Sequence, residues 1–216
     1  MIKILAIIGI VGGLMCAVAD LLLDLKGPEN KKLGTSGAVD SMWAVMSHGR
    51  FVASDIIAMF AVPMYTCGFI ALMLKLSESH RILAIALSIT FLCGAMGGFM
   101  IHTFLCMMPT VYQKLAKEKQ ETLAIDIIEG LLKQISVPFF TLYSMLVIVP
   151  SIAVILLIIT GALQLPIWMI ILNPVVIQII GLGFRATKLK IFIDAPSCCA
   201  ASIGLAMYGV LALSIL

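Results

Sequence analysis

The side chains that could do chemistry are acids and histidines that lie at one end of the apolar stretches of the chain. Asp20 closes the first stretch, Asp55 lies a few residues into the second, and His102 lies near the end of the third. Carboxylates and an imidazole are suited to general acid–base catalysis, and histidine titrates near neutral pH. They also bind divalent metals, so a metal cofactor is one hypothesis, although no ligand set is identified. We predict Asp20, Asp55 and His102 as catalytic residues.

Four further polar residues are predicted to contact a substrate: Arg50, His48, Asp24 and Asn173. The planar guanidinium of Arg50 could hold an anionic headgroup. Its structural alternative is an ion pair with Asp55 or Asp20. Asn173 precedes a proline, which cannot donate a backbone hydrogen bond, so the asparagine either repairs a kink or lines a polar cavity.

The composition places these residues in a membrane protein. Of the 216 residues, 62% are hydrophobic and 12% are charged, against about 25% charged in soluble domains. A spanning helix needs roughly 20 apolar residues, and an open sheet edge in lipid leaves backbone groups unpaired. We therefore predict an all-α, single-domain bundle over residues 1–216 with six transmembrane helices, at 4–23, 51–74, 82–107, 135–160, 166–184 and 195–215.

The basic residues predict an orientation in the cell membrane. The termini and two of the linkers carry only Lys3, Lys75 and Arg81. The other three linkers carry the remaining basic residues, which are Lys26, Lys31, Lys32, Arg50, Lys114, Lys117, Lys119, Lys133, Arg185, Lys188 and Lys190. Cytoplasmic loops are enriched in Lys and Arg. We therefore expect a multi-pass protein with both termini outside the cytoplasm.

The third linker, residues 109–134, contains an apolar stripe at helical spacing, formed by Ala124, Ile127, Ile128, Leu131 and Leu132. Charged residues occupy much of the rest. This pattern predicts an amphipathic helix that lies at the membrane surface and leads into the fourth span. A lid over a cytoplasmic opening is the alternative interpretation.

Small residues recur every four positions on two of the predicted spans. Gly9 and Gly13 precede Asp20 on the first, and Gly94 and Gly98 precede His102 on the third. Such stripes allow helices to approach closely. They should direct Asp20 and His102 into the bundle, and they could also support a homodimer.

One region resembles a known group of sequences. The run from Asp20 to Asn30, followed by Trp43 and by Ser47-His48-Gly49-Arg50-Phe51, resembles an uncharacterised family of bacterial six-span membrane proteins. The similarity lies mainly in residues 20–51. It implies a bacterial origin and a six-span plan, and it implies no activity.

Three functions fit these features. The first is a membrane enzyme that modifies a lipid or amphiphile at the cytoplasmic leaflet. The second is a proton-coupled transporter of a small solute, with helix breaks at Asn173 and Pro150 as hinges. The third is a non-catalytic subunit or sensor whose polar groups are paired among themselves. Membrane lipids are the expected partners, and no nucleic acid is expected. Whether the protein is an enzyme is left open.

Overall fold

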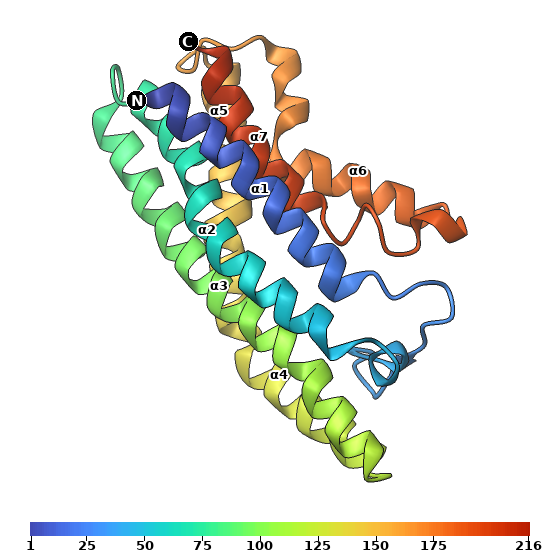
Figure 1. The fold of residues 1–216 in the computed structure, drawn as a ribbon. Coiled ribbons are helices and arrows are strands. Elements are labelled where there is room, and N and C mark those ends of the chain that lie inside the picture. The colour runs from blue at the N-terminus through green and yellow to red at the C-terminus, as the bar shows by residue number, and fades with distance from the viewer.

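The computed structural model describes residues 1–216 as an elongated helical bundle (Figure 1). Its seven α-helices are α1 Ile2–Asp24, α2 His48–Leu76, α3 Arg81–Lys117, α4 Glu121–Tyr143, α5 Val149–Ile159, α6 Pro174–Ala186 and α7 Ala200–Ser214. Two short strands, β1 Lys32–Leu33 and β2 Val39–Asp40, pair antiparallel in the linker after α1. The predicted all-α class is confirmed. Both termini lie at the same end of the bundle (Figure 1).

Four helical stretches are long and apolar enough to cross a membrane. They are α1, α2, α3 and Glu121–Ile159, in which the π-helical segment η2 (Ser144–Ile148) joins α4 to α5. The predicted fifth and sixth spans contain the shorter helices α6 and α7. In the fifth, a 3-10 helix, η3 (Ile167–Leu172), ends before α6. The break arises because Pro174 has no N–H, and because Asn173 caps α6 by accepting a hydrogen bond from the Val175 N–H at 3.1 Å.

The third linker differs from the expected surface helix. α3 continues through Pro109 to Lys117, and α4 begins at Glu121, so the two helices form one long hairpin (Figure 1). Part of the predicted apolar stripe is buried, because Ala124 and Ile128 are fully buried, whereas Ile127 is exposed. It packs within the protein, in a cluster that also contains residues of the first linker. The hairpin thus holds the linker after α1.

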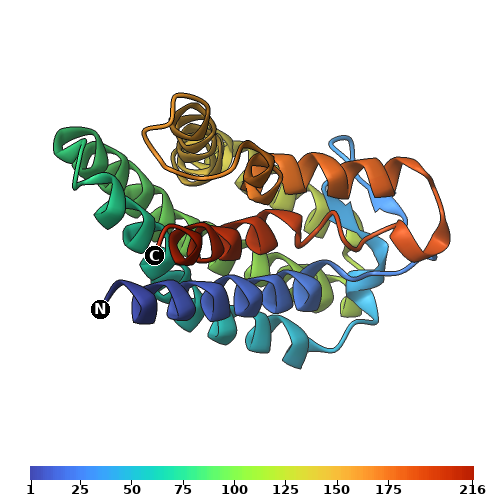
Figure 2. The ribbon, with the colours of Figure 1, turned by 90° about the horizontal axis from the view of Figure 1, so that it is seen from above.

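α1 packs tightly against two other helices through its glycines. A Cβ atom on Gly9 would lie 2.2 Å from the Gly68 Cα atom of α2, and one on Gly13 would lie 2.4 Å from the Ala206 nitrogen of α7. Seen from above, α7 lies between α1 and α6 (Figure 2). The Gly9–Gly13 stripe, one of the two for which a homodimer was considered, thus packs against α2 and α7 of the same chain.

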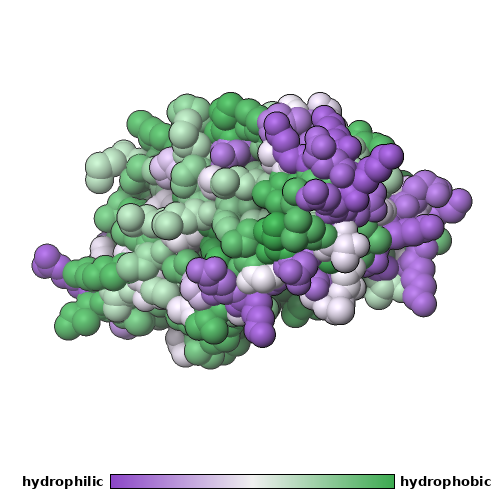
Figure 3. Space-filling view, turned by 90° about the horizontal axis from the view of Figure 1, so that it is seen from below, coloured by the Kyte–Doolittle hydropathy of each residue, from purple (hydrophilic) through white to green (hydrophobic).

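The core and the surface are both rich in apolar side chains. Near the end that carries the termini, an aromatic cluster fills the core, with the rings of Phe69 and Phe91 stacked at 4.1 Å and Tyr208 edge-on to Phe69 at 4.9 Å. On the outside of α1, large apolar residues are exposed along one face: Ile4, Ile7, Val11, Leu14 and Val18. From below, hydrophilic side chains gather in one part of the surface, beside wide hydrophobic areas (Figure 3).

The glycine contacts predict a position-specific loss of stability. Gly13→Ala places a methyl group against the backbone of Ala206 and should lower the free energy of unfolding by about 1–3 kcal/mol, the usual effect of overpacking. Thermal unfolding of the purified protein in detergent measures it. Gly130→Ala is the matched control, because a Cβ there has nothing within 4 Å. A Gly13→Ala protein as stable as wild type would contradict the packing.

Candidate functional site

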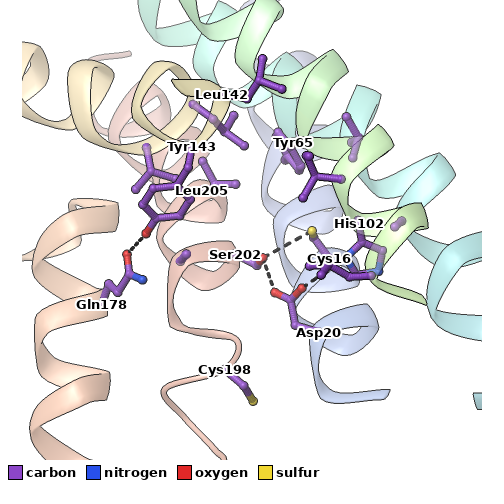
Figure 4. Close-up of a pocket in the computed structure, with 18 of the residues that line it drawn as sticks. Cys16, Asp20, Tyr65, His102, Leu142, Tyr143, Gln178, Cys198, Ser202 and Leu205 are labelled. Carbon is purple, nitrogen blue, oxygen red and sulfur yellow. Dashed lines mark hydrogen bonds and ion pairs between the residues drawn. The ribbon is translucent and has the colours of Figure 1, made fainter. Parts of the chain in front are cut away.

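A cavity of about 250 Å³ lies between α1, α2, α3 and α7 on one side and α4 and α6 on the other. Fourteen of its 20 lining residues are hydrophobic, so its few polar groups stand out. Asp20, His102, Ser202 and Cys16 lie together on one wall, and the Tyr143 hydroxyl and Gln178 meet on the other (Figure 4). This is an apolar space with a polar end, which is the general character of ligand sites.

Asp20 is held at the polar end by the start of α7. Its Oδ2 accepts a hydrogen bond of 2.5 Å from the Ser202 hydroxyl, and the Cys16 sulfur lies 3.4 Å from the same hydroxyl oxygen. Cys16 and Asp20 are one helical turn apart on α1, so both face α7. The other carboxylate oxygen, Oδ1, points toward His102 (Figure 4).

His102 is fixed by hydrogen bonds on its far side. Its Nε2 lies 2.9 Å from the Ser54 hydroxyl oxygen, and that hydroxyl donates to the Ala19 carbonyl at 2.7 Å. Because the hydrogen of Ser54 is used, Nε2 must be the donor to its oxygen. In the neutral ring the proton is therefore on Nε2, and Nδ1 is an acceptor. Nδ1 lies 3.8 Å from Asp20 Oδ1, which is too far for a direct hydrogen bond.

The order Ser54, His102, Asp20 matches the connectivity of a serine hydrolase triad. Burial argues against a nucleophilic serine here. Ser54 is fully buried, does not line the cavity, and donates its only hydrogen to a backbone carbonyl. Ser54 therefore orients the imidazole, and the edge available for chemistry is the gap between His102 Nδ1 and Asp20 Oδ1.

The structure places five of the seven predicted site residues outside the cavity, and three of them make local hydrogen bonds. Asp55 accepts a hydrogen bond from the Thr103 hydroxyl at 2.7 Å. His48 is exposed at the start of α2, 3.3 Å from the Thr110 hydroxyl. Asn173 is buried, where it caps α6 and donates to the Ser151 carbonyl at 3.0 Å. Of the three residues predicted as catalytic, only Asp20 and His102 share the cavity.

Arg50 has its guanidinium occupied by the end of α1. It donates to the backbone carbonyls of Leu21, Leu22 and Leu25 at 3.3, 3.1 and 2.9 Å. The last carbonyls of a helix have no partner within it, and a cation there also interacts favourably with the helix dipole. Arg50 thus caps α1, and it makes neither of the ion pairs considered from the sequence.

Asp24 belongs to an ionic cluster in the linker. Lys26 Nζ lies 2.6 Å from both Asp24 Oδ1 and Asp40 Oδ2, and Lys32 Nζ lies 2.8 Å from Asp40 Oδ1. Asp194, which precedes α7, accepts the backbone N–H groups of Lys26 and Gly27 at 2.8 and 2.5 Å. The cluster fixes the linker against the ends of α1 and α7.

Sequence reasoning did not select several residues of the site. Ser54, Ser202, Tyr143 and Gln178 are common polar residues in apolar helices, and no local pattern marks them. Only Cys16 carried a signal, because it lies four residues before Asp20. No group of three or more His, Cys, Asp or Glu side chains is placed to hold a metal ion, so the hypothesis of a divalent metal has no ligand set.

Comparison with known proteins assigns the chain to a family. A model described as "Family of unknown function (DUF6796)" matches residues 1–216, so the chain belongs to that family. The expected membership of an uncharacterised family is confirmed, and the similarity covers the whole chain, where the resemblance lay mainly in residues 20–51. No curated protein and no solved structure matches the chain.

The ionic cluster predicts that the linker loosens in acid. Burial alone would raise the pKa of Asp40, but hydrogen bonds from Lys26, Lys32 and Asn30 outweigh it and hold that pKa below its usual range. The stabilisation is therefore complete above the unfolded pKa of about 3.9, and it is lost as the pH falls through the lower folded pKa. Hydrogen exchange of residues 25–47, measured against pH, tests this.

Two variants sharpen the measurement. Asp40→Asn should loosen the linker already at neutral pH, because removing one partner of a buried ion pair typically costs roughly 3–5 kcal/mol. Glu29→Gln changes an exposed carboxylate and should keep the wild-type profile. Equal protection in Asp40→Asn and wild type would show that the cluster does not hold the linker.

Proposed function

We propose that this member of a family of unknown function is an integral membrane protein that crosses the bilayer six times, with α6 and α7 completing the fifth and sixth crossings. The exposed apolar face of α1 and the four long apolar stretches support a membrane location. The basic linkers support a cytoplasmic position for the α3–α4 hairpin and the α1–α2 linker, which leaves both termini outside.

Within this arrangement, we propose that the protein is an enzyme that modifies a lipid or another amphiphile at the cytoplasmic side of the membrane. One observation carries the proposal. A carboxylate oxygen of Asp20 and an imidazole nitrogen of His102 face each other at 3.8 Å in the wall of a mainly apolar cavity. Each side chain is oriented by a hydrogen bond to a serine at its other polar atom. Such a pair can exchange a proton with the polar group of a ligand whose apolar part fills the cavity.

The chain's own residues suggest the division of labour. The Ser54 oxygen accepts a hydrogen bond from the Nε2–H group of His102, so Nδ1 is free to take a proton from the ligand. Ser202 holds Asp20 Oδ2, so that Oδ1 faces Nδ1 and stabilises the imidazolium formed by that transfer. The mainly apolar lining excludes water and strengthens both interactions.

A transporter is the second candidate, and the break at Asn173–Pro174 is the observation in its favour. Two features weigh against it. The Asn173 side chain donates its amide hydrogen to the Ser151 carbonyl and accepts from the Val175 N–H, and it does not line the cavity. The packed rings of Phe69, Phe91 and Tyr208 occupy the route toward the outer end. A non-catalytic subunit is disfavoured because Asp20 Oδ1 and His102 Nδ1 lack hydrogen-bond partners.

The test compares variants inside and outside the cavity. Purified protein in nanodiscs made from a total lipid extract is incubated, and the consumed and formed species are followed by mass spectrometry. Asp20→Asn and His102→Gln should each lower turnover by on the order of 10²-fold or more, the usual contribution of an acid–base group. Asp55→Asn should retain turnover, because Asp55 lies outside the cavity.

Thermal unfolding of each variant separates loss of chemistry from loss of the fold. The proposal is wrong if folded Asp20→Asn and His102→Gln proteins turn over as fast as wild type. It is also wrong if the wild-type protein consumes no species of the extract.

A further inference from the structure

With Asp20 ionised and His102 neutral, the polar end of the cavity has two acceptors that face each other with no donor from the protein between them. The neutral His102 ring presents a lone pair at Nδ1, because its proton is committed to Ser54, and Asp20 presents Oδ1, because its Oδ2 is committed to Ser202. The two atoms are 3.8 Å apart. A group with at least two N–H donors would satisfy both.

We infer that the cavity binds a single-chain amphiphile with a protonated primary amine as its headgroup, held between Asp20 Oδ1 and His102 Nδ1. This inference rests on the proposed function and names its substrate class. An ammonium group has three donors, of which two would meet these acceptors. Its positive charge would also compensate the carboxylate, which is costly to bury alone.

The charges around the cavity support a cationic headgroup over an anionic one. No Lys or Arg lines the cavity. Arg50 and Lys26, which lie near the end of α1, are committed elsewhere, Arg50 to the carbonyls of α1 and Lys26 to Asp24 and Asp40. A phosphate or carboxylate headgroup would therefore lie beside Asp20 without a counter-ion, and like charges at low dielectric repel strongly.

The size and lining of the cavity fit a single short chain. Its volume of about 250 Å³ lies just below the roughly 300–1,000 Å³ of common ligand pockets, which suits one short chain. Val62, Leu142, Leu146 and Leu205 are among the apolar lining residues that would contact the chain.

Tyr143 and Gln178 lie across the cavity from Asp20 and show where the chain would leave it (Figure 4). Their hydrogen bond is the only side-chain hydrogen bond between α4 and α6. The boundary between α4 and α6, here called the seam, is thus joined by one side-chain hydrogen bond, on the cavity wall opposite Asp20. A chain anchored at Asp20 would point toward this seam and the surrounding hydrocarbon.

The experiment is a headgroup series on the wild-type protein. Octylamine, octanol and octanoate, each with a diazirine at the chain end, are photolysed with the protein in nanodiscs of a zwitterionic phospholipid. Labelled peptides are mapped by mass spectrometry. Labelling at Leu142 or Tyr143 is divided by labelling at Ile4 and Ile7, which lie on the exposed face of α1, to correct for partitioning into the bilayer.

We expect the corrected signal of octylamine to exceed that of octanoate by at least about tenfold, the effect of roughly 1.4 kcal/mol. Octanol should lie between them. Asp20→Asn should remove the preference for the amine, whereas Asp55→Asn should keep it. If Asp20→Asn fails to fold, the comparison of the three probes on the wild-type protein still tests the inference. Ser202→Ala, which retains the carboxylate of Asp20, should then still prefer the amine.

The outcomes separate the inference from the proposed function. Cavity labelling by octanoate or octanol equal to that by octylamine would overturn the inference and leave the acid–base site standing. No cavity labelling by any probe, together with unchanged turnover in Asp20→Asn, would overturn both.

Discussion

The close contact of α1 with α2 and α7 is the constraint on which the rest of the structure depends. Gly9 and Gly13 have no side chains that would keep the helix axes apart, and they face Gly68 and the small Ala206 on the partner helices. At this separation, the carboxylate of Asp20 comes within hydrogen-bond distance of Ser202 on α7, and the Ala19 carbonyl comes within reach of Ser54 on α2. The position of Asp20 and its partners is therefore a consequence of the glycine contacts of α1 with α2 and α7, which lie nearer the N-terminus of α1.

The same contact explains why several charged residues serve the fold. α1 ends next to α2 and α7, so its last carbonyls need donors from these neighbours. Arg50 supplies them from the first turn of α2, and Asp194 holds the backbone just beyond the helix. Charges that resemble binding groups in the sequence thus anchor the end of a helix. What remains free in the cavity is one acid and one imidazole.

Composition and periodicity were enough to predict the long helices, because α1 to α4 are continuous apolar or amphipathic runs. They could not predict where α6 and α7 begin, because those starts depend on tertiary contacts. Asn173 caps α6, and Asp194, which lies before α7, binds the backbone of the linker after α1. Composition and periodicity also suggested a helix boundary near Pro109, whereas α3 runs through this buried proline. Tertiary contacts decide these points.

The site was half predictable for a similar reason. Asp20 and His102 follow glycine stripes, so their inward direction was visible in the sequence. Asp55 was chosen on α2, whereas the neighbouring Ser54 faces His102. Successive residues point in different directions around a helix, and the sequence did not fix the rotation of α2. Ser202 lies 182 residues from Asp20, a separation at which no local pattern can pair two residues.

The gap between Asp20 and His102 is the feature that packing alone does not explain. In the linker, Asp40 forms ion pairs with Lys26 and Lys32 and accepts a hydrogen bond from Asn30, so this chain places cations against a carboxylate where the role is structural. Asp20 accepts a hydrogen bond only at Oδ2, and the neutral His102 ring presents another acceptor to its Oδ1. Both free acceptors line the cavity, where a ligand can reach them. A ligand donor that occupies the gap would hydrogen-bond to both, so the unfilled position itself contributes to the affinity for the ligand.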